Sequence, residues 1–237
     1  MHLHDMTMKD FKDGLKETQT LIVPYGTIEA HGTHLPLSTD TIAMVRVCEE
    51  AAKQIPVFVA PPIHYGVCTS SGQHPGSLGI TPETLRRITI DIVRDGAKKG
   101  LKNFILISGH GGGIHTFAMK EAGEILKAEN KDIEVAALTI YEILGKEAEL
   151  IAESEGDSHA GELETSLMLH LTPGLVKGRS PKERPQFKRP FIATDKIKYW
   201  PGAVNGDPSL ATIEKGGRFF NVMIEKTVGL VREIEKL

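Results

Sequence analysis

The sequence lacks any excess of basic residues. It contains 28 Lys and Arg against 31 Asp and Glu, which gives a formal net charge of -3 and a pI near 6.4. Proteins that bind the phosphate backbone of DNA or RNA need clustered Lys and Arg to neutralise it. Nucleic acid is therefore not expected as a partner.

Long apolar runs and paired cysteines are missing as well. No stretch approaches the ~18 consecutive apolar residues of a membrane-spanning helix, and the first residues, MHLHDMTMKDFKDG, do not read as a signal peptide. The two cysteines, Cys48 and Cys68, have no Cys-x-x-Cys spacing and are too few for a disulfide framework. We expect no membrane partner and a reducing, cytoplasmic location.

What the sequence does contain is an ordinary globular composition. Hydrophobic residues make up 40% and charged residues 25% of its 237 positions. This length suffices for one large domain with a well-buried core. The sequence predicts a single domain over residues 1–237.

Short β-rich runs alternate with amphipathic helical segments. The segment 81–100 shows this most clearly, with Thr81 as the expected N-cap and Pro82 at the first helical position. Strands are expected at 20–26, 57–63 and 133–141, with a further strand in 103–113 that runs into a Gly-rich turn. Helices are expected at 41–55, 81–100, 115–129, 142–155, 160–171 and 211–236, and an irregular segment at 173–209.

This alternation predicts the α/β class, with a mainly parallel sheet and helices on both faces. In open parallel sheets, ligands bind beyond the carboxyl ends of the strands. Glu29-x-His31 and Ser108-Gly109-His110 both follow expected strands. These two motifs are therefore the first candidates for a functional site.

Metal-ligating side chains are concentrated in GTIEAHGTHLPLSTD, which contains Glu29, His31, His34 and Asp40. Carboxylate and imidazole together suit zinc, manganese or iron, and a bridging carboxylate such as Asp40 could hold two ions about 3.5 Å apart. The alternative is a solvated loop in which Asp40 caps the following helix. A solvated loop could account for any one of these residues, but it accounts poorly for four metal-ligating side chains so close together.

His110 lies between glycines in SGHGGG. Glycines let the backbone approach an ion or a substrate closely, although they also suit a tight turn without a ligand. Because His110 adds a second histidine at a strand end, the metal interpretation is favoured.

A third cluster, DSHAGELETS, contains His159, Glu162 and Glu164 near the start of an expected helix. At helical spacing His159 and Glu162 would share a face, and Glu164 would point elsewhere unless the helix begins after His159. The spacing does not choose between the two carboxylates. An acidic first turn capped by Ser158 is the alternative without function.

The loop SSGQHPGS, with Ser71 and His74, could line a substrate pocket or could be a surface turn. Ser70, Ser71 and Ser108 are not part of a Gly-x-Ser-x-Gly elbow, which gives a serine-hydrolase triad little support.

The motifs G-x-x-E-x-H-G-x-H-L-P-L-x-T-D, S-G-H-G-G and H-A-G-E-x-E-T-S, followed by GDPSLATIEKG, together resemble the creatininase (creatinine amidohydrolase) family. The resemblance covers nearly the whole chain. It implies a single α/β domain, usually assembled as a homohexamer, that cleaves cyclic or linear amides of small molecules in a metal-dependent reaction.

Carried over by position, the resemblance makes Glu29, Asp40 and His110 ligands of one ion, and His31 with the bridging Asp40 ligands of a second. His159 resembles the catalytic histidine of the family. Two positions depart from creatininase itself, which has a ligand Glu at the position of Gly112 and a substrate-contacting aromatic residue at the position of Gly111.

These departures change two expectations. We predict that Glu164 replaces the missing ligand and that Glu162 orients His159 in the catalytic centre, with the reverse assignment as the alternative. Ser71, His74 and Gly111 are the expected substrate contacts. Creatinine is not the expected substrate; formamides and peptide-like amides, on which related branches act, fit equally well.

The predicted reaction is amide hydrolysis by a metal-activated water, with His159 giving a proton to the departing nitrogen. An orienting role for His159 is the alternative. The competing function is a non-catalytic metal- or ligand-binding protein of the same fold.

Overall fold

Four parallel strands form the sheet at the centre of the molecule. The computed structural model describes residues 1–188 and 190–237. The strand order is β2-β1-β3-β4, with all neighbours parallel. The strands are β1 (Thr20–Tyr25), β2 (Phe58–Val59), β3 (Asn103–Ser108) and β4 (Glu134–Thr139). The expected single-domain α/β fold is confirmed.

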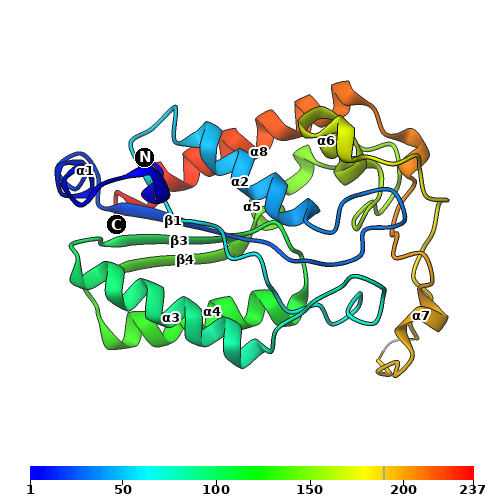
Figure 1. The fold of residues 1–237 in the computed structure, drawn as a ribbon, viewed down its shortest axis with the longest axis horizontal. Helices are drawn as coiled ribbons and strands as arrows, with labels where there is room; N and C mark the ends of the chain where they lie inside the picture. Colours follow the sequence, from blue (N-terminus) through cyan, green and yellow to red (C-terminus); the bar gives the residue numbers. More distant parts are fainter. Residues whose placement is uncertain (189) are drawn as a thin grey trace.

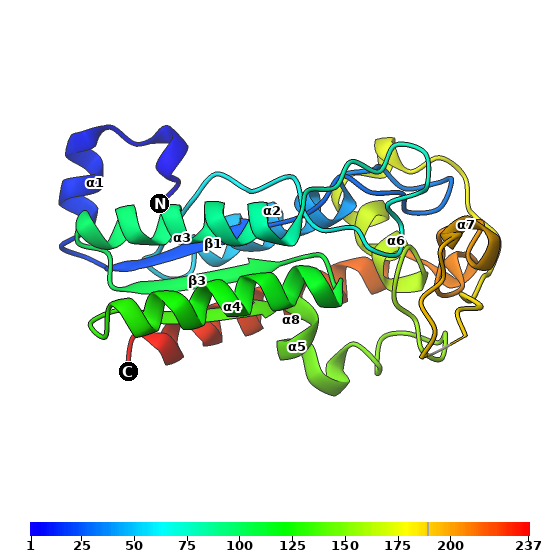
Figure 2. The ribbon, with the colours of Figure 1, turned by 90° about the horizontal axis from the view of Figure 1, so that it is seen from below.

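Helices cover both faces of this sheet (Figure 1). One face is covered by α3 (Pro82–Lys98) and α4 (Gly113–Glu129), and the other by α2 (Thr39–Ala51) and α8 (Ile213–Ile234). Figure 2 shows the α3 and α4 pair running side by side along the sheet. Helix α6 (Glu162–Leu171) packs on α8.

The core has two layers because side chains alternate along each strand. Ile22 of β1 packs into the layer beneath α2 and α8, whereas Leu21 and Val23 pack into the layer beneath α3 and α4. Every residue of β1 is buried, as expected for a parallel strand covered on both faces.

The start of α3 confirms a sequence prediction in detail. The Thr81 hydroxyl accepts a hydrogen bond from the Thr84 amide, and Pro82 occupies the first helical position. Proline fits there because its missing N–H would have had no partner within the helix.

Two expected elements are wrong. The strand expected at 57–63 is reduced to Phe58–Val59, since Pro61 and Pro62 cannot donate the amide hydrogen bonds of a continuing ladder. The helix expected at 142–155 is only α5 (Ile140–Leu144) followed by a 3₁₀ turn, and Gly145 leaves the helix with a φ of 56°.

The described residues of the segment expected to be irregular, 173–188 and 190–209, contain only short helical turns and no long helix or strand. The short elements in or beside it are 3₁₀ turns at Pro173–Leu175 and Pro208–Leu210 and helix α7 (Lys196–Tyr199). Two further short elements, a 3₁₀ turn at Leu3–Asp5 and helix α1 (Met8–Gly14), precede β1. This segment extends beyond the carboxyl ends of the strands, where Figure 1 shows it in yellow to orange.

No helix within residues 1–188 and 190–237 combines the length and the apolar character needed to cross a membrane.

Candidate metal centre

A cavity of about 550 Å³ opens at the carboxyl ends of β1, β3 and β4. Its floor comes from the loops that leave these strands, and its walls come from the loop before α6 and from the irregular segment. The lining includes Glu29, Asp40, Ser71, His110, Gly111, Tyr141, His159, Glu164, Phe187 and Trp200. The cavity therefore lies where the strand topology predicted a ligand site.

Glu29, Asp40 and His110 form a first trio of candidate ligands, with one ligand atom from each within 4.8 Å of the others. His110 Nδ1 lies 2.6 Å from Glu29 Oε1 and 3.4 Å from Asp40 Oδ2. All three side chains are buried.

His31, Asp40 and Glu164 form a second trio by the same criterion. His31 Nε2 lies 3.2 Å from Asp40 Oδ1 and 3.7 Å from Glu164 Oε2. Asp40 thus belongs to both trios and turns one carboxylate oxygen toward each. The Thr27 hydroxyl donates a hydrogen bond to Asp40 Oδ2 and fixes the orientation of this shared carboxylate.

Backbone carbonyls fix which nitrogen of each imidazole faces the carboxylates. His31 Nδ1 pairs with the Glu29 carbonyl at 3.1 Å, and His110 Nε2 pairs with the Val67 carbonyl at 3.2 Å. Because a carbonyl only accepts, these nitrogens carry the hydrogen. The other nitrogen of each ring, His31 Nε2 or His110 Nδ1, is left to face the carboxylates.

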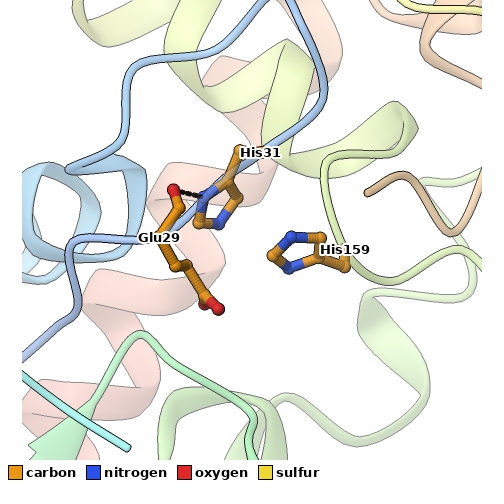
Figure 3. A group of neighbouring side chains, drawn as sticks. All are labelled: Glu29, His31 and His159. Atoms are coloured by element: carbon orange, nitrogen blue, oxygen red, sulfur yellow. Dashed lines mark hydrogen bonds between the residues drawn. The ribbon is translucent and has the colours of Figure 1, made fainter. Parts of the chain in front are cut away.

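His159 faces the same space from the opposite side. Figure 3 shows Glu29 and His31 on the loop after β1, with His159 reaching toward them from the loop before α6. The His159 ring stacks on His31 with centroids 4.2 Å apart, and its Nε2 donates to the Ala30 carbonyl at 2.7 Å. Trp200 lies against the ring, with centroids 5.0 Å apart. The His159 ring is therefore held on three sides.

The charge balance of this cluster indicates a cation site. Burial alone would lower the pKa of His31, but the carboxylates of Asp40, Glu164 and Glu29 raise it to about 10. The pKa of His110 is likewise raised, against the effect of burial, by Glu29 and Asp40. Three buried carboxylates thus attract protons onto neighbouring imidazoles, which shows that they need positive charge.

An unsatisfied atom supports the same conclusion. Among the described residues, Glu29 Oε1 is buried without a hydrogen-bond donor, although His110 Nδ1 lies 2.6 Å away. If His110 were neutral with its hydrogen on Nε2, two lone pairs would face each other across this gap, so the pair needs either a second proton on His110 or a cation. A cation coordinated by both atoms removes the repulsion, so these residues fit a metal ion.

The predicted substrate contacts lie in different places. Ser71 lines the cavity and donates its hydroxyl to Glu29 Oε2, and Gly111 is part of the cavity wall. His74 lies behind the wall, where its two ring nitrogens pair with the carbonyls of Ser71 at 3.1 Å and Trp200 at 2.6 Å. The loop containing Ser71 is thus linked to the loop containing Trp200.

Glu162 lies outside this site. Helix α6 begins at Glu162, after His159, so the two residues do not share a helical face. The Glu162 carboxylate accepts the amides of Glu153 and Ser154 and pairs with Lys215. The expectation that Glu162 orients His159 is therefore not supported, whereas Glu164, two residues later in the same first turn of α6, lines the cavity.

His34, the remaining histidine of the first motif, is also outside the two trios. Its ring nitrogens pair with the hydroxyls of Ser180 and Thr165. Burial lowers the pKa of His34 to about 4. It is a neutral histidine that ties the loop after β1 to α6.

Sequence reasoning missed three side chains that shape the cavity: Tyr141, Trp200 and Asp157. Tyr141 was recoverable, because it is the last residue of the strand expected at 133–141 and strand ends meet at this edge of the sheet. Trp200 and Asp157 are contributed by irregular segments, and no periodic pattern indicated them.

Comparison with known proteins agrees with this geometry. Residues 4–231 match the family model described as Creatininase: Creatinine amidohydrolase. A mycofactocin precursor peptide peptidase of Mycobacterium ulcerans is 30% identical over 233 residues, covering 90% of this chain and 84% of the relative. A creatinine amidohydrolase of Pseudomonas putida is 27% identical over 234 residues, covering 90% of this chain and 88% of the relative.

Solved structures show the same fold. A crystal structure of creatinine amidohydrolase superposes with a TM-score of 0.89 at 24% identity, covering 98% of this chain and 97% of the other. A zinc–zinc form of a creatininase mutant and a manganese form of creatininase give TM-scores of 0.85 and 0.87, each at 23% identity over 98% of this chain and 97% of theirs.

Proposed function

The chain belongs to the creatininase (creatinine amidohydrolase) family, and on that premise we propose that it is an amidohydrolase that uses two divalent metal ions to hydrolyse a carbon–nitrogen amide bond. The relatives described above are hydrolases of amide or peptide bonds, which supports amide hydrolysis in general. The use of two metal ions is our own proposal. The single observation that carries it is the position of Asp40 between two trios of buried ligand atoms.

The two trios would hold one ion each. Glu29, Asp40 and His110 would ligate the first ion, and His31, Asp40 and Glu164 the second. Mixed carboxylate and imidazole donors of this kind suit zinc, manganese or iron. When bound, such ions lower the pKa of a water toward neutrality and polarise an amide carbonyl.

Neighbouring residues orient the side chains that would ligate the ions. Ser71 donates to Glu29 and Thr27 donates to Asp40, so each carboxylate has a fixed direction. Carbonyls hold the rings of His31 and His110 in the required tautomer. Such outer contacts raise ligand basicity and keep the ligands in place before an ion arrives.

His159 is the proposed proton donor to the departing nitrogen. Its Nε2 hydrogen is held by the Ala30 carbonyl, and its Nδ1 forms no hydrogen bond within the described chain. Nδ1 is therefore the atom that can take up a proton and release it to the leaving amine. Stacking against His31 and Trp200 keeps the ring from rotating away.

The cavity sets the class of substrate. A volume of about 550 Å³ admits a small molecule, and Phe187 and Trp200 supply aromatic walls that limit access by water. Cyclic amides, formamides and short peptide-like amides all fit these dimensions.

We further propose, from the family relationship, that the chain assembles as a homo-oligomer, with a hexamer as the expected form.

A hydrolysis screen tests the proposal. Protein reconstituted with zinc, manganese or iron is assayed against cyclic amides, formamides and short peptides, with Asp40→Ala as the matched inactive control. We expect turnover of at least one class that chelation abolishes and metal restores. Metal uptake with no turnover of any class would instead favour a non-catalytic metal-binding protein, and turnover that survives chelation would contradict the metal mechanism.

A further inference from the structure

Tyr141 lies where β4 passes into α5, at the same rim of the sheet as the candidate ligands. The N-terminus of α5 is fixed by a capping box, in which the Glu142 side chain accepts the Thr139 amide. The Tyr141 ring extends over Gly111, where an added Cβ would lie 3.6 Å from the ring. It thus fills the space next to a position that has no side chain of its own.

The Tyr141 hydroxyl contacts one ligand directly. It donates a hydrogen bond of 2.7 Å to Glu164 Oε1. The other oxygen, Glu164 Oε2, accepts the Ala160 amide at 2.6 Å and lies 3.7 Å from His31 Nε2. The two oxygens of Glu164 are therefore fixed from opposite directions, one by a side chain and one by the backbone.

Glu164 needs such support because it reaches the site from outside the sheet. It belongs to the first turn of α6, and a glutamate has three side-chain torsions to restrict. Within the described residues, the other hydrogen bond to the Glu164 carboxylate comes from the amide of Ala160, which has a left-handed backbone with a φ of 50°. Without Tyr141, a single amide would define the orientation of the carboxylate.

The protonation state of Tyr141 suits a donor. A tyrosine hydroxyl of ordinary pKa is already protonated at neutral pH. Its hydrogen is therefore available for Glu164 throughout the neutral range.

We propose that Tyr141 is a positioning residue that holds Glu164 as a ligand of the His31–Asp40–Glu164 trio and so sets the affinity of that trio for its ion. This inference rests on the proposed two-ion function. The Glu164 carboxylate is thus held by a side chain that follows β4. Residues 111 and 112, which follow β3, are glycines and have no side chain that could hold it.

Metal titration of Tyr141→Phe tests the inference. The substitution removes the hydroxyl and keeps the ring over Gly111, so we expect the fold to be retained. Tyr65→Phe, at an exposed position with no hydrogen bond within the described chain, is the matched control. Metal-free proteins are titrated with Mn²⁺ by calorimetry, and circular-dichroism melting curves verify folding.

We expect Tyr141→Phe to weaken one of two binding events by about tenfold, as measured for losses of outer contacts to metal ligands, and to leave the other unchanged. Tyr65→Phe should match the wild type in both events. Unchanged affinity in Tyr141→Phe would overturn the inference. So would equal losses in both events together with a lower melting temperature, because that pattern marks a purely structural role.

A double-mutant cycle with Glu164→Gln tests whether the effect passes through Glu164. In the Glu164→Gln background, Tyr141→Phe should cause no further loss of affinity, whereas additive losses would overturn the inference. The titration needs no substrate, so it separates the two proposals. Two ions with no amide hydrolysis would overturn the proposed activity alone, and a wild type that binds a single ion would overturn both.

Discussion

The His110 ring occupies the space that a side chain on Gly112 would need. A Cβ built on Gly112 would overlap His110 Nε2. The backbone of Gly112 has a φ of -64°, which any residue can adopt, so the requirement for glycine is purely steric. A side chain at position 112 is thus incompatible with His110 in its observed orientation.

Gly112→Ala should therefore displace His110 and weaken the ion held by Glu29, Asp40 and His110 by about tenfold or more. Gly113→Ala is the matched control, since no atom lies within 4 Å of a Cβ there. Metal titration of both variants is the measurement. Equal affinities in the two variants would contradict this steric account.

Glu164→Gln and Glu162→Gln should separate a ligand from a structural carboxylate. Glu164→Gln should lower the affinity of one ion by about tenfold with little change in folding. Glu162→Gln should keep both ions but reduce the free energy of unfolding by about 1–3 kcal/mol, because Lys215 and the amides at 153 and 154 lose a charged acceptor. Metal analysis and denaturant unfolding distinguish these outcomes, and the reverse pattern would require the two assignments to be exchanged.

His74→Ala should destabilise the cavity wall. The His74 Nε2 lies 2.6 Å from the Trp200 carbonyl, and removing the ring leaves that carbonyl without this donor, whereas the Ser71 carbonyl keeps the hydrogen bond from the His74 amide. We expect a loss of about 1–3 kcal/mol in the free energy of unfolding. His64→Ala, at an exposed position, serves as the control and should change stability by less than about 0.5 kcal/mol. Similar stabilities for the two variants would show that the link is unimportant.

Asp157 should make the stability of the metal-free protein depend on pH. Burial raises the pKa of Asp157 to about 6, above its ordinary value of 3.8. The folded state therefore binds this proton more tightly than the unfolded state does. The resulting stability is complete below about pH 4 and is lost as the pH rises through about 6.

Denaturant unfolding across this pH range checks the expectation. The wild type should lose on the order of 3 kcal/mol relative to Asp157→Asn, whose side chain does not titrate. Parallel pH profiles for the two proteins would show that Asp157 is not the responsible group.

Much of this architecture was predictable because the sequence carries periodic signals. The strand expected within 103–113 has a clear apolar run, and the helix begun by Thr81 and Pro82 has clear apolar spacing and capping residues. Both are confirmed, the strand as Asn103–Ser108. The short extent of β2 and the early end of α5 were not predicted. There, local backbone chemistry at Pro61, Pro62 and Gly145 overrides the apolar pattern.

The site was predictable to the extent that its residues follow strands. Glu29, His31, Asp40 and His110 meet at one rim, since parallel strands end at the same edge of the sheet. The choice between Glu162 and Glu164 depended on where α6 begins, and a shift of a few residues in a helix start changes which side chain faces the cavity. The contact between Tyr141 and Glu164 joins segments with no shared periodicity, so sequence reasoning could not find it.

The bridging position of Asp40 is tested most directly by the metal content of reconstituted wild type, Asp40→Ala and His31→Ala, measured as ions per chain by elemental analysis. If Asp40 joins two sites, the wild type should hold close to two ions, Asp40→Ala should lose both, and His31→Ala should lose mainly one. A wild type that holds one ion or fewer, or equal partial losses in the two variants, would contradict the account.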